Sequence, residues 1–91
     1  MKKLPDDVAA YRRTDVFTQD SVPQGLLKNH STAAGVWGLI RVERGSLEYT
    51  IGEDEVHVLA PDRIGVVEPA TVHHVRPLGE VRFFVEFYRK E

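Results

Sequence analysis

The stretch from Ser46 to Ile51, SLEYTI, alternates polar and apolar side chains at every position. A period of two is typical of a β-strand with one buried face, whereas an amphipathic helix repeats every 3.6 residues. The neighbouring segments follow the same period, and only residues 6–11 could form a short helical turn. The sequence therefore predicts an all-β protein.

Short turn signals cut the rest of the chain into strands. Candidate turns lie where Gly, Pro and Asp occur between apolar segments, at residues 44–45, 52–54, 61–62 and 78–79. They leave strands near residues 24–30, 35–43, 46–51, 55–59, 63–68, 72–77 and 81–89. Roughly seven or eight strands at a spacing of about 8–12 residues predict a sandwich or a barrel.

The register of the first hairpin follows from its turn. If Arg44 and Gly45 form a two-residue turn, Ile40 faces Tyr49 and the apolar side chains of both strands share one face. Arg41 then lies opposite Glu48 on the other face, where the two side chains could form a cross-strand ion pair. The agreement of the apolar faces favours this register.

Composition limits the classes of protein to which the chain could belong. Its 91 residues are enough for one domain with one core. There are 12 Lys and Arg residues against 14 Asp and Glu, so we expect no nucleic-acid partner. No apolar segment reaches the roughly 18 residues of a membrane span or resembles a signal peptide. The lack of cysteine excludes disulfides and fits a cytoplasmic protein.

Two adjacent histidines are the strongest candidates for a functional site. His73 and His74 open a strand directly after the Pro-containing turn within the segment 66–75. A neutral imidazole at the mouth of a small β-barrel is a common ligand of transition metals. Strand parity places the two side chains on opposite faces, and we favour His73 as the inward one.

The second predicted hairpin brings a carboxylate close to His73. If Leu78 and Gly79 form a two-residue turn, His73 faces Phe84 and Glu86 is its diagonal neighbour. A carboxylate among aromatic side chains is costly to bury without a cation or hydrogen bonds. The alternative is that Glu86 lies on the outer, solvated face, because a change of one residue in turn length would reverse the parity.

The other two histidines are weaker candidates on the residues alone. His30 ends the strand expected at 24–30, and only the closure of a barrel could bring it to His73. A surface or loop position is its alternative. His57 alternates with two valines, and we predict that it faces solvent.

Trp37 and Leu39 lie on the face opposite Ile40 and Val42 in the predicted strand. Two large apolar side chains on an outer face predict a second sheet or a homodimer contact. Packing beneath the N-terminal segment is an equal alternative. A homodimer is therefore expected but not required by this pattern.

The order of several short motifs resembles a known family. These motifs are Gly25…His30, Gly35-Val36-Trp37, Leu47-Glu48-Tyr49, Glu68-Pro69-Ala70-Thr71-Val72-His73 and Phe84-Val85-Glu86-Phe87. Together they resemble the TehB/YeaR-like domain, a small cupin-type domain associated with tellurite resistance. The resemblance implies a single cupin domain over residues 1–91, a double-stranded β-helix or jelly-roll barrel. Residues 1–22 would be its N-terminal edge segment and residues 23–91 its barrel.

The same resemblance implies a metal site made of His30, His73 and Glu86, with His74 as a weaker candidate. Two histidines and one carboxylate suit zinc first, and also iron, manganese or nickel. The segment 61–73 is similar to the second cupin motif. The His-x-His pair of the first cupin motif is absent, because only His30 stands there. This departure favours binding over catalysis.

Three functional hypotheses follow from these residues. The first is a metal-binding cupin module with a stress- or oxyanion-related role. The second is a metal-dependent enzyme in which Glu86 or His74 acts as acid or base. The third is a metal-free module that holds a small organic ligand or an anion near Arg41, Arg63 or Arg82. Some tellurite-resistance proteins join such a domain to a methyltransferase, but no fingerprint for the methyl donor is visible in these residues.

Overall fold

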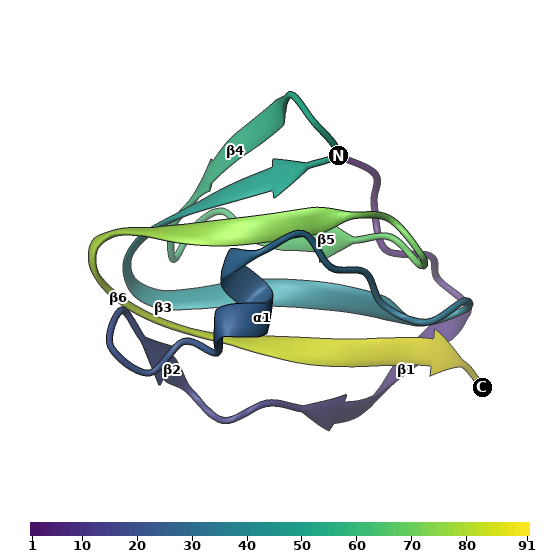
Figure 1. The fold of residues 1–91 in the computed structure, drawn as a ribbon. Helices are drawn as coiled ribbons and strands as arrows, with labels where there is room; N and C mark the ends of the chain where they lie inside the picture. Colours follow the sequence, from purple (N-terminus) through teal and green to yellow (C-terminus); the bar gives the residue numbers. More distant parts are fainter.

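Two long antiparallel strands form the centre of the computed structural model, which describes residues 1–91 (Figure 1). Strand β3 spans Trp37–Ile51 and strand β6 spans His73–Lys90. They pair from one end of β3 to the other. The alternation that predicted a strand at 46–51 is confirmed, and the chain is an all-β domain as predicted.

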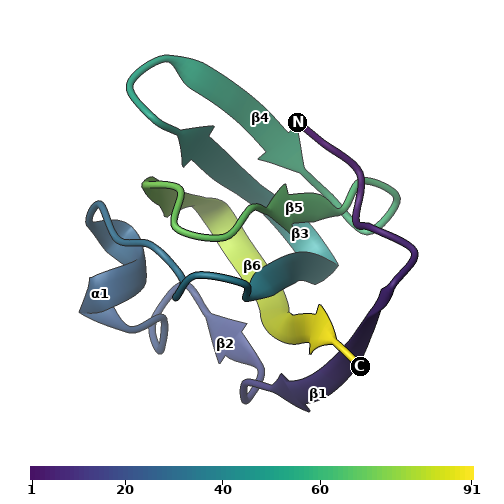
Figure 2. The same ribbon diagram turned by 90° about the vertical axis from the view of Figure 1, so that its right-hand side faces the viewer.

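Four shorter strands complete one six-stranded sheet with the order β1-β6-β3-β4. β1 (Val8–Arg13) lies at one edge, within the segment 1–22 that was expected to form an edge and where residues 6–11 could have formed a helical turn, and β4 (Glu55–Leu59) lies at the other edge. β2 (Phe17–Thr18) pairs with β6, and β5 (Gly65–Val67) pairs with β3. The helix α1 (Gln24–Leu27) stands to one side of the sheet (Figure 2).

The β3–β6 ribbon bends near its middle. Its register shifts between Gly45 and Leu47, opposite residues 78–80 of β6. Gly45 has a φ of +79°, and a Cβ at this position would lie 1.9 Å from the carbonyl oxygen of Glu80. Only glycine fits there, because any side chain would overlap the partner strand. Figure 1 shows both strands curving at the same side of the molecule.

The two hairpins predicted at residues 44–45 and 78–79 are therefore wrong. Both places carry a glycine with positive φ, as turns do, but each long strand continues through the irregularity. Arg41 and Glu48 consequently do not face each other. Arg41 instead pairs with Glu86 on the neighbouring strand.

The sheet is open, with free edges at β1 and β4, so the predicted closed jelly-roll barrel is not established. The strand predicted at 24–30 is also wrong, because the chain forms the one-turn helix α1 there. Pro23 precedes the helix with a φ of −60°, a value that suits a helix start. No helix in the structure has the length and hydrophobicity that crossing a membrane requires.

The hydrophobic core lies inside the bent ribbon. Its ten buried residues are Ile40, Val42, Leu47, Tyr49, Leu59, Val67, Val75, Val81, Phe83 and Val85. The Tyr49 hydroxyl donates a hydrogen bond of 2.9 Å to the carbonyl of Val66. Burial raises the pKa of Tyr49, so the phenol keeps the proton that it donates. This bond ties β5 to the centre of the sheet.

Two predictions about side-chain faces need correction. The side chain of His57 is largely covered and bonds to Glu55, whereas Val56 and Val58 are 53% and 46% exposed. The parity of β4 is thus the reverse of the predicted one. Leu39 is buried at 4% exposure although it was placed on an outer face, so both faces of β3 are covered here. The homodimer stays a prediction.

The bend should make Gly45 much less tolerant of substitution than Gly79. Gly79 has a φ of +87°, but a Cβ at this position would have no atom within 4 Å, so Gly79→Ala meets only backbone strain of about 1 kcal/mol. Gly45→Ala adds a clash with backbone, and we expect it to lower the free energy of unfolding by more than about 3 kcal/mol. Urea titrations of both variants measure this difference. Equal losses would contradict the role of Gly45 in the bend.

Candidate functional site

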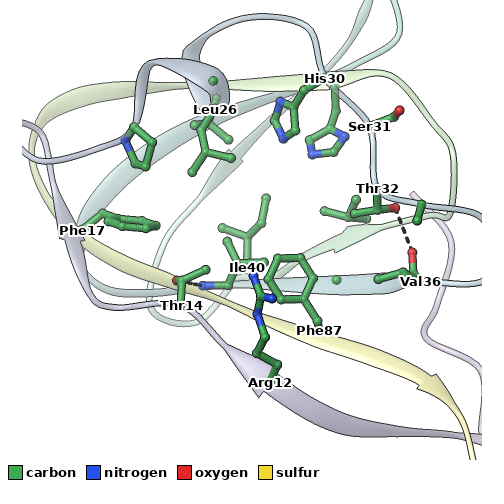
Figure 3. Close-up of a pocket in the computed structure, with 18 of the residues that line it drawn as sticks. Arg12, Thr14, Phe17, Leu26, His30, Ser31, Thr32, Val36, Ile40 and Phe87 are labelled. Carbon is green, nitrogen blue, oxygen red and sulfur yellow. Dashed lines mark hydrogen bonds between the residues drawn. The ribbon is translucent and has the colours of Figure 1, made fainter.

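A cavity of about 500 Å³ opens between the sheet and the segment of residues 23–36 (Figure 3). Eleven of its 20 lining residues are hydrophobic. The apolar walls include Phe17 from β2, Leu26 from α1, Ile40 from β3 and Phe87 from β6. A concave, mainly apolar space of this size with a few polar groups is typical of a small-molecule site.

The rings of His30 and His73, here called the histidine pair, lie next to each other in the cavity wall. Their centroids are 4.1 Å apart, with an angle of 56° between the planes. The backbones bridge as well, because His30 N–H donates to His73 O at 3.0 Å and His73 N–H donates to His30 O at 2.8 Å. His73 also packs its edge against the ring of Tyr49, 5.8 Å away. The bridge fixes the loop before β3 against the start of β6.

Hydrogen bonds set the same tautomer in both rings. His30 Nδ1 lies 3.0 Å from the carbonyl oxygen of Lys28, and His73 Nδ1 lies 2.9 Å from that of Thr71. A carbonyl only accepts, so each Nδ1 carries the proton and each neutral ring has its lone pair on Nε2. Neither Nε2 forms a hydrogen bond with the protein. Every fully enclosed side-chain nitrogen in the structure has a hydrogen-bond partner, so these two nitrogens are not fully enclosed. Both Nε2 atoms are therefore accessible acceptors.

Burial keeps His73 neutral. His73 is 4% exposed, and this burial lowers the pKa of its imidazole. The hydrogen bond to the Thr71 carbonyl acts in the opposite direction, and the nearby His30 and His74 lower the pKa further. The net direction is downward, so His73 is an uncharged hydrogen-bond acceptor at neutral pH.

The lowered pKa of His73 predicts a pH-dependent stability. Between the folded-state pKa and the usual value of about 6.5, the unfolded chain holds more protons, so acid favours unfolding. The contribution of His73 is complete above about pH 6.5 and is lost as pH falls through the folded-state pKa. Each unit of pKa difference corresponds to about 1.4 kcal/mol. We expect the free energy of unfolding to fall from pH 7.5 to 5.5, and to fall less in His73→Gln.

His74→Gln is the matched control for this measurement, because His74 is the adjacent residue on the opposite face. Because His74 is only the smallest of the causes that lower the pKa of His73, the loss of stability of His74→Gln between pH 7.5 and 5.5 should lie close to that of the unmodified chain and above that of His73→Gln. The explanation is wrong if His73→Gln shows the same pH dependence as the control.

The structure does not bring Glu86 or His74 to the histidine pair. Glu86 accepts a hydrogen bond from Arg41 and lies within 3.5 Å of the Tyr88 hydroxyl, outside the cavity lining. His74 Nδ1 lies 2.9 Å from the side-chain oxygen of Asn29. The hairpin that would have aligned Glu86 with the histidines does not exist, which explains its different position. No group of three or more His, Cys, Asp or Glu side chains is arranged to hold a metal.

The arginines named for an anion site are also elsewhere. Arg41 pairs with Glu86, and Arg82 lies 3.7 Å from Glu43. Arg63 does not line the cavity either. None of the three provides a cation to the cavity.

Sequence reasoning missed Arg12 as a cavity residue. Its guanidinium lies 5.4 Å from the ring centroid of Phe87 and belongs to the cavity lining. No carboxylate forms an ion pair with it. Arg12-Arg13 is one of three adjacent basic pairs in the sequence, and the position of Arg12 at the cavity depends on the pairing of β1 with β6.

Two threonines in the wall are already satisfied. Thr14 Oγ1 accepts from the N–H of Val85 at 3.1 Å and donates to the carbonyl of Asp15 at 2.8 Å. Thr32 Oγ1 donates to the carbonyl of Val36 at 2.8 Å. These hydroxyls fix the wall. The polar groups of the lining that keep free hydrogen-bonding capacity are the Nε2 atoms of the histidine pair, the Arg12 guanidinium and the hydroxyls of Tyr11 and Ser31.

The fold and the cavity define a small all-β domain with a largely apolar pocket and a histidine pair in its wall. The family model of the TehB-like domain matches residues 12–85. The chain belongs to this family, as the resemblance of its motifs predicted.

Two relatives from Haemophilus influenzae, strains Rd and 10810, are both named probable S-adenosyl-L-methionine-dependent methyltransferase TehB. Each is 30% identical over 83 residues, which cover 85% of this chain and 29% of the relative. The crystal structure of TehB from Haemophilus influenzae superposes with a TM-score of 0.86 at 28% identity, over 93% of this chain and 32% of that one. This chain thus spans less than a third of these relatives.

A solved structure of a protein from Escherichia coli K12 shares the fold with a TM-score of 0.91. The identity is 19%, and the match covers 100% of this chain and 99% of that chain. The likeness concerns the fold alone. It extends over almost the complete length of both chains.

The predicted metal-binding cupin function and its zinc, iron, manganese or nickel cofactor are wrong. The structure holds no suitable cluster of three metal-binding side chains. The relatives are named as methyltransferases that depend on S-adenosyl-L-methionine, which is an organic cofactor and not a transition metal. The histidine pair therefore needs an explanation other than metal coordination.

Proposed function

We propose that this domain binds a small molecule with an apolar body in the cavity beside the histidine pair. The observation that carries the proposal is a cavity of about 500 Å³ with 11 hydrophobic residues among its 20 lining residues. Cavities of about 300–1,000 Å³ with mainly apolar walls bury most of the surface of a small ligand. The few free polar groups would then orient the ligand.

We further propose that the domain serves a methyltransferase as a substrate- or effector-binding part. The support is its presence within relatives named as S-adenosyl-L-methionine-dependent methyltransferases, of which it covers 29%. Nucleotide-like cofactors commonly bind where a glycine-rich turn joins a parallel strand to a helix. Every strand pairing in this domain is antiparallel, and its helix has four residues. We therefore assign the ligand, and not the methyl donor, to this cavity.

The open sheet is, in this proposal, a reduced cupin-type jelly roll. This proposal is supported by the bend of β3 and β6, because the two strands pair with each other both before and after the register shift between Gly45 and Leu47. Residues 1–22 would form the edge segment and residues 23–91 the curved body around the cavity. This arrangement leaves the cavity accessible beside α1.

Indole is a suitable uncharged probe for the cavity. We expect it to shift backbone NMR signals of cavity residues, including Leu26 and Phe87, in a saturable way. Leu26→Trp places a large side chain at the cavity wall and should weaken indole binding at least about 10-fold by occupying the space. Val58→Trp is the matched control, because Val58 is 46% exposed on β4 and outside the cavity lining.

Val58→Trp should bind indole as the unmodified chain does. The proposed function is contradicted if indole produces no saturable shifts, or if both variants weaken binding equally.

A further inference from the structure

The cavity offers two chemically different polar ends. One end is the histidine pair, whose Nε2 atoms have no protein partner. The other is the guanidinium of Arg12, which has no carboxylate partner. In Figure 3, His30 lies at the top of the view, whereas Arg12 rises from below and its guanidinium lies beside Ile40 and Phe87.

Resting on the proposed ligand-binding function, we propose that the ligand is a small aromatic acid with a hydrogen-bond donor opposite its carboxylate. The donor, a hydroxyl or a ring N–H, meets the histidine pair. The carboxylate meets Arg12, and the aromatic ring lies between the apolar walls.

The histidine end selects a donor. Each Nδ1–H donates a hydrogen bond to a backbone carbonyl, so each Nε2 presents a lone pair to the cavity. With the ring centroids 4.1 Å apart, the two lone pairs form a region that repels other acceptors, including a carboxylate. Protonation would reverse this preference, but His73 is buried at 4% exposure, where charge is costly. A hydroxyl or N–H is therefore the group that this end binds.

The Arg12 end selects an anion. The cavity lining contains no Asp or Glu, so nothing in the wall competes for the guanidinium. Arg13 follows directly but lies outside the cavity lining, with its guanidinium 4.9 Å from the ring centroid of Phe84. A guanidinium binds a carboxylate through two parallel hydrogen bonds, so Arg12 suits a carboxylate at this end of the cavity.

The walls between the ends favour an aromatic body. Phe17 and Phe83 pack edge to face with centroids 5.7 Å apart, and Phe87 stands below the Arg12 guanidinium. Aromatic rings prefer such edge-to-face and offset contacts with other rings. One substituted ring also fits a cavity of about 500 Å³.

Three probes separate the two polar ends. 4-Hydroxyphenylacetate carries both groups, phenylacetate lacks the donor, and 4-methylphenol lacks the carboxylate. Dissociation constants at pH 7.5 come from NMR titration or calorimetry. We expect 4-hydroxyphenylacetate to bind at least about 10-fold more tightly than either of the other two, since each lost hydrogen bond to a charged or shielded group costs about that factor.

Variants assign each preference to its end. Arg12→Met keeps the stem over Phe87 and should remove the advantage of 4-hydroxyphenylacetate over 4-methylphenol. His73→Phe should remove the advantage over phenylacetate, and His30→Phe tests the same end if the buried substitution prevents folding. Arg13→Met is the matched control, because Arg13 is the adjacent cation outside the cavity lining, and both preferences should persist in it.

The outcomes separate this inference from the proposed function. Equal affinity of the unmodified chain for all three probes overturns the ligand class while indole binding still supports a cavity site. Loss of affinity for all three probes alike in Arg12→Met also overturns it, because a carboxylate contact cannot affect 4-methylphenol. Absence of binding by the three probes and by indole contradicts both proposals.

Discussion

The bend of the β3–β6 ribbon at Gly45 is the constraint on which the cavity depends. His73 and Phe87 lie 14 residues apart on β6, and both line the cavity. In a straight strand they would be separated by about 46 Å, at about 3.3 Å per residue. The whole molecule extends only 36 Å along its longest axis. The ribbon must therefore fold over, and a glycine at position 45 permits this because its backbone touches that of Glu80.

The sequence predicts the strands better than their connections. The period of two identifies the stretch 46–51 and the short strand β4, because one face of each is buried. Gly45 and Gly79 mark the correct places for a backbone irregularity, and both have positive φ. A glycine of this kind serves a hairpin turn and a bulge equally well. Which of them forms depends on a partner strand more than 30 residues away, and local sequence does not contain that information.

The same long-range pairing decides which candidate residues meet. The parity of His73 in its own strand is a local property, and the structure places this residue in the interior. The position of Glu86 was inferred from a predicted hairpin turn at residues 78–79. Because that turn does not form, the predicted contact between Glu86 and His73 is wrong. Its charge is instead compensated by Arg41 across the β3–β6 ladder. Arg12 reaches the cavity only because β1 pairs with the end of β6, a contact between the two ends of the chain.

The histidine pair places two uncompensated acceptors in a mainly apolar wall. Stability alone does not require them, because the bridge between the segments is made by backbone groups that any residue provides. An apolar side chain in place of either ring would avoid the cost of partial desolvation. The two Nδ1 bonds also hold the rings in one tautomer, which a structural filler would not need. The two Nε2 acceptors thus have a fixed orientation toward the cavity, which favours ligand recognition. The conformational entropy of these side chains is lost on folding, so binding a ligand does not have to order them.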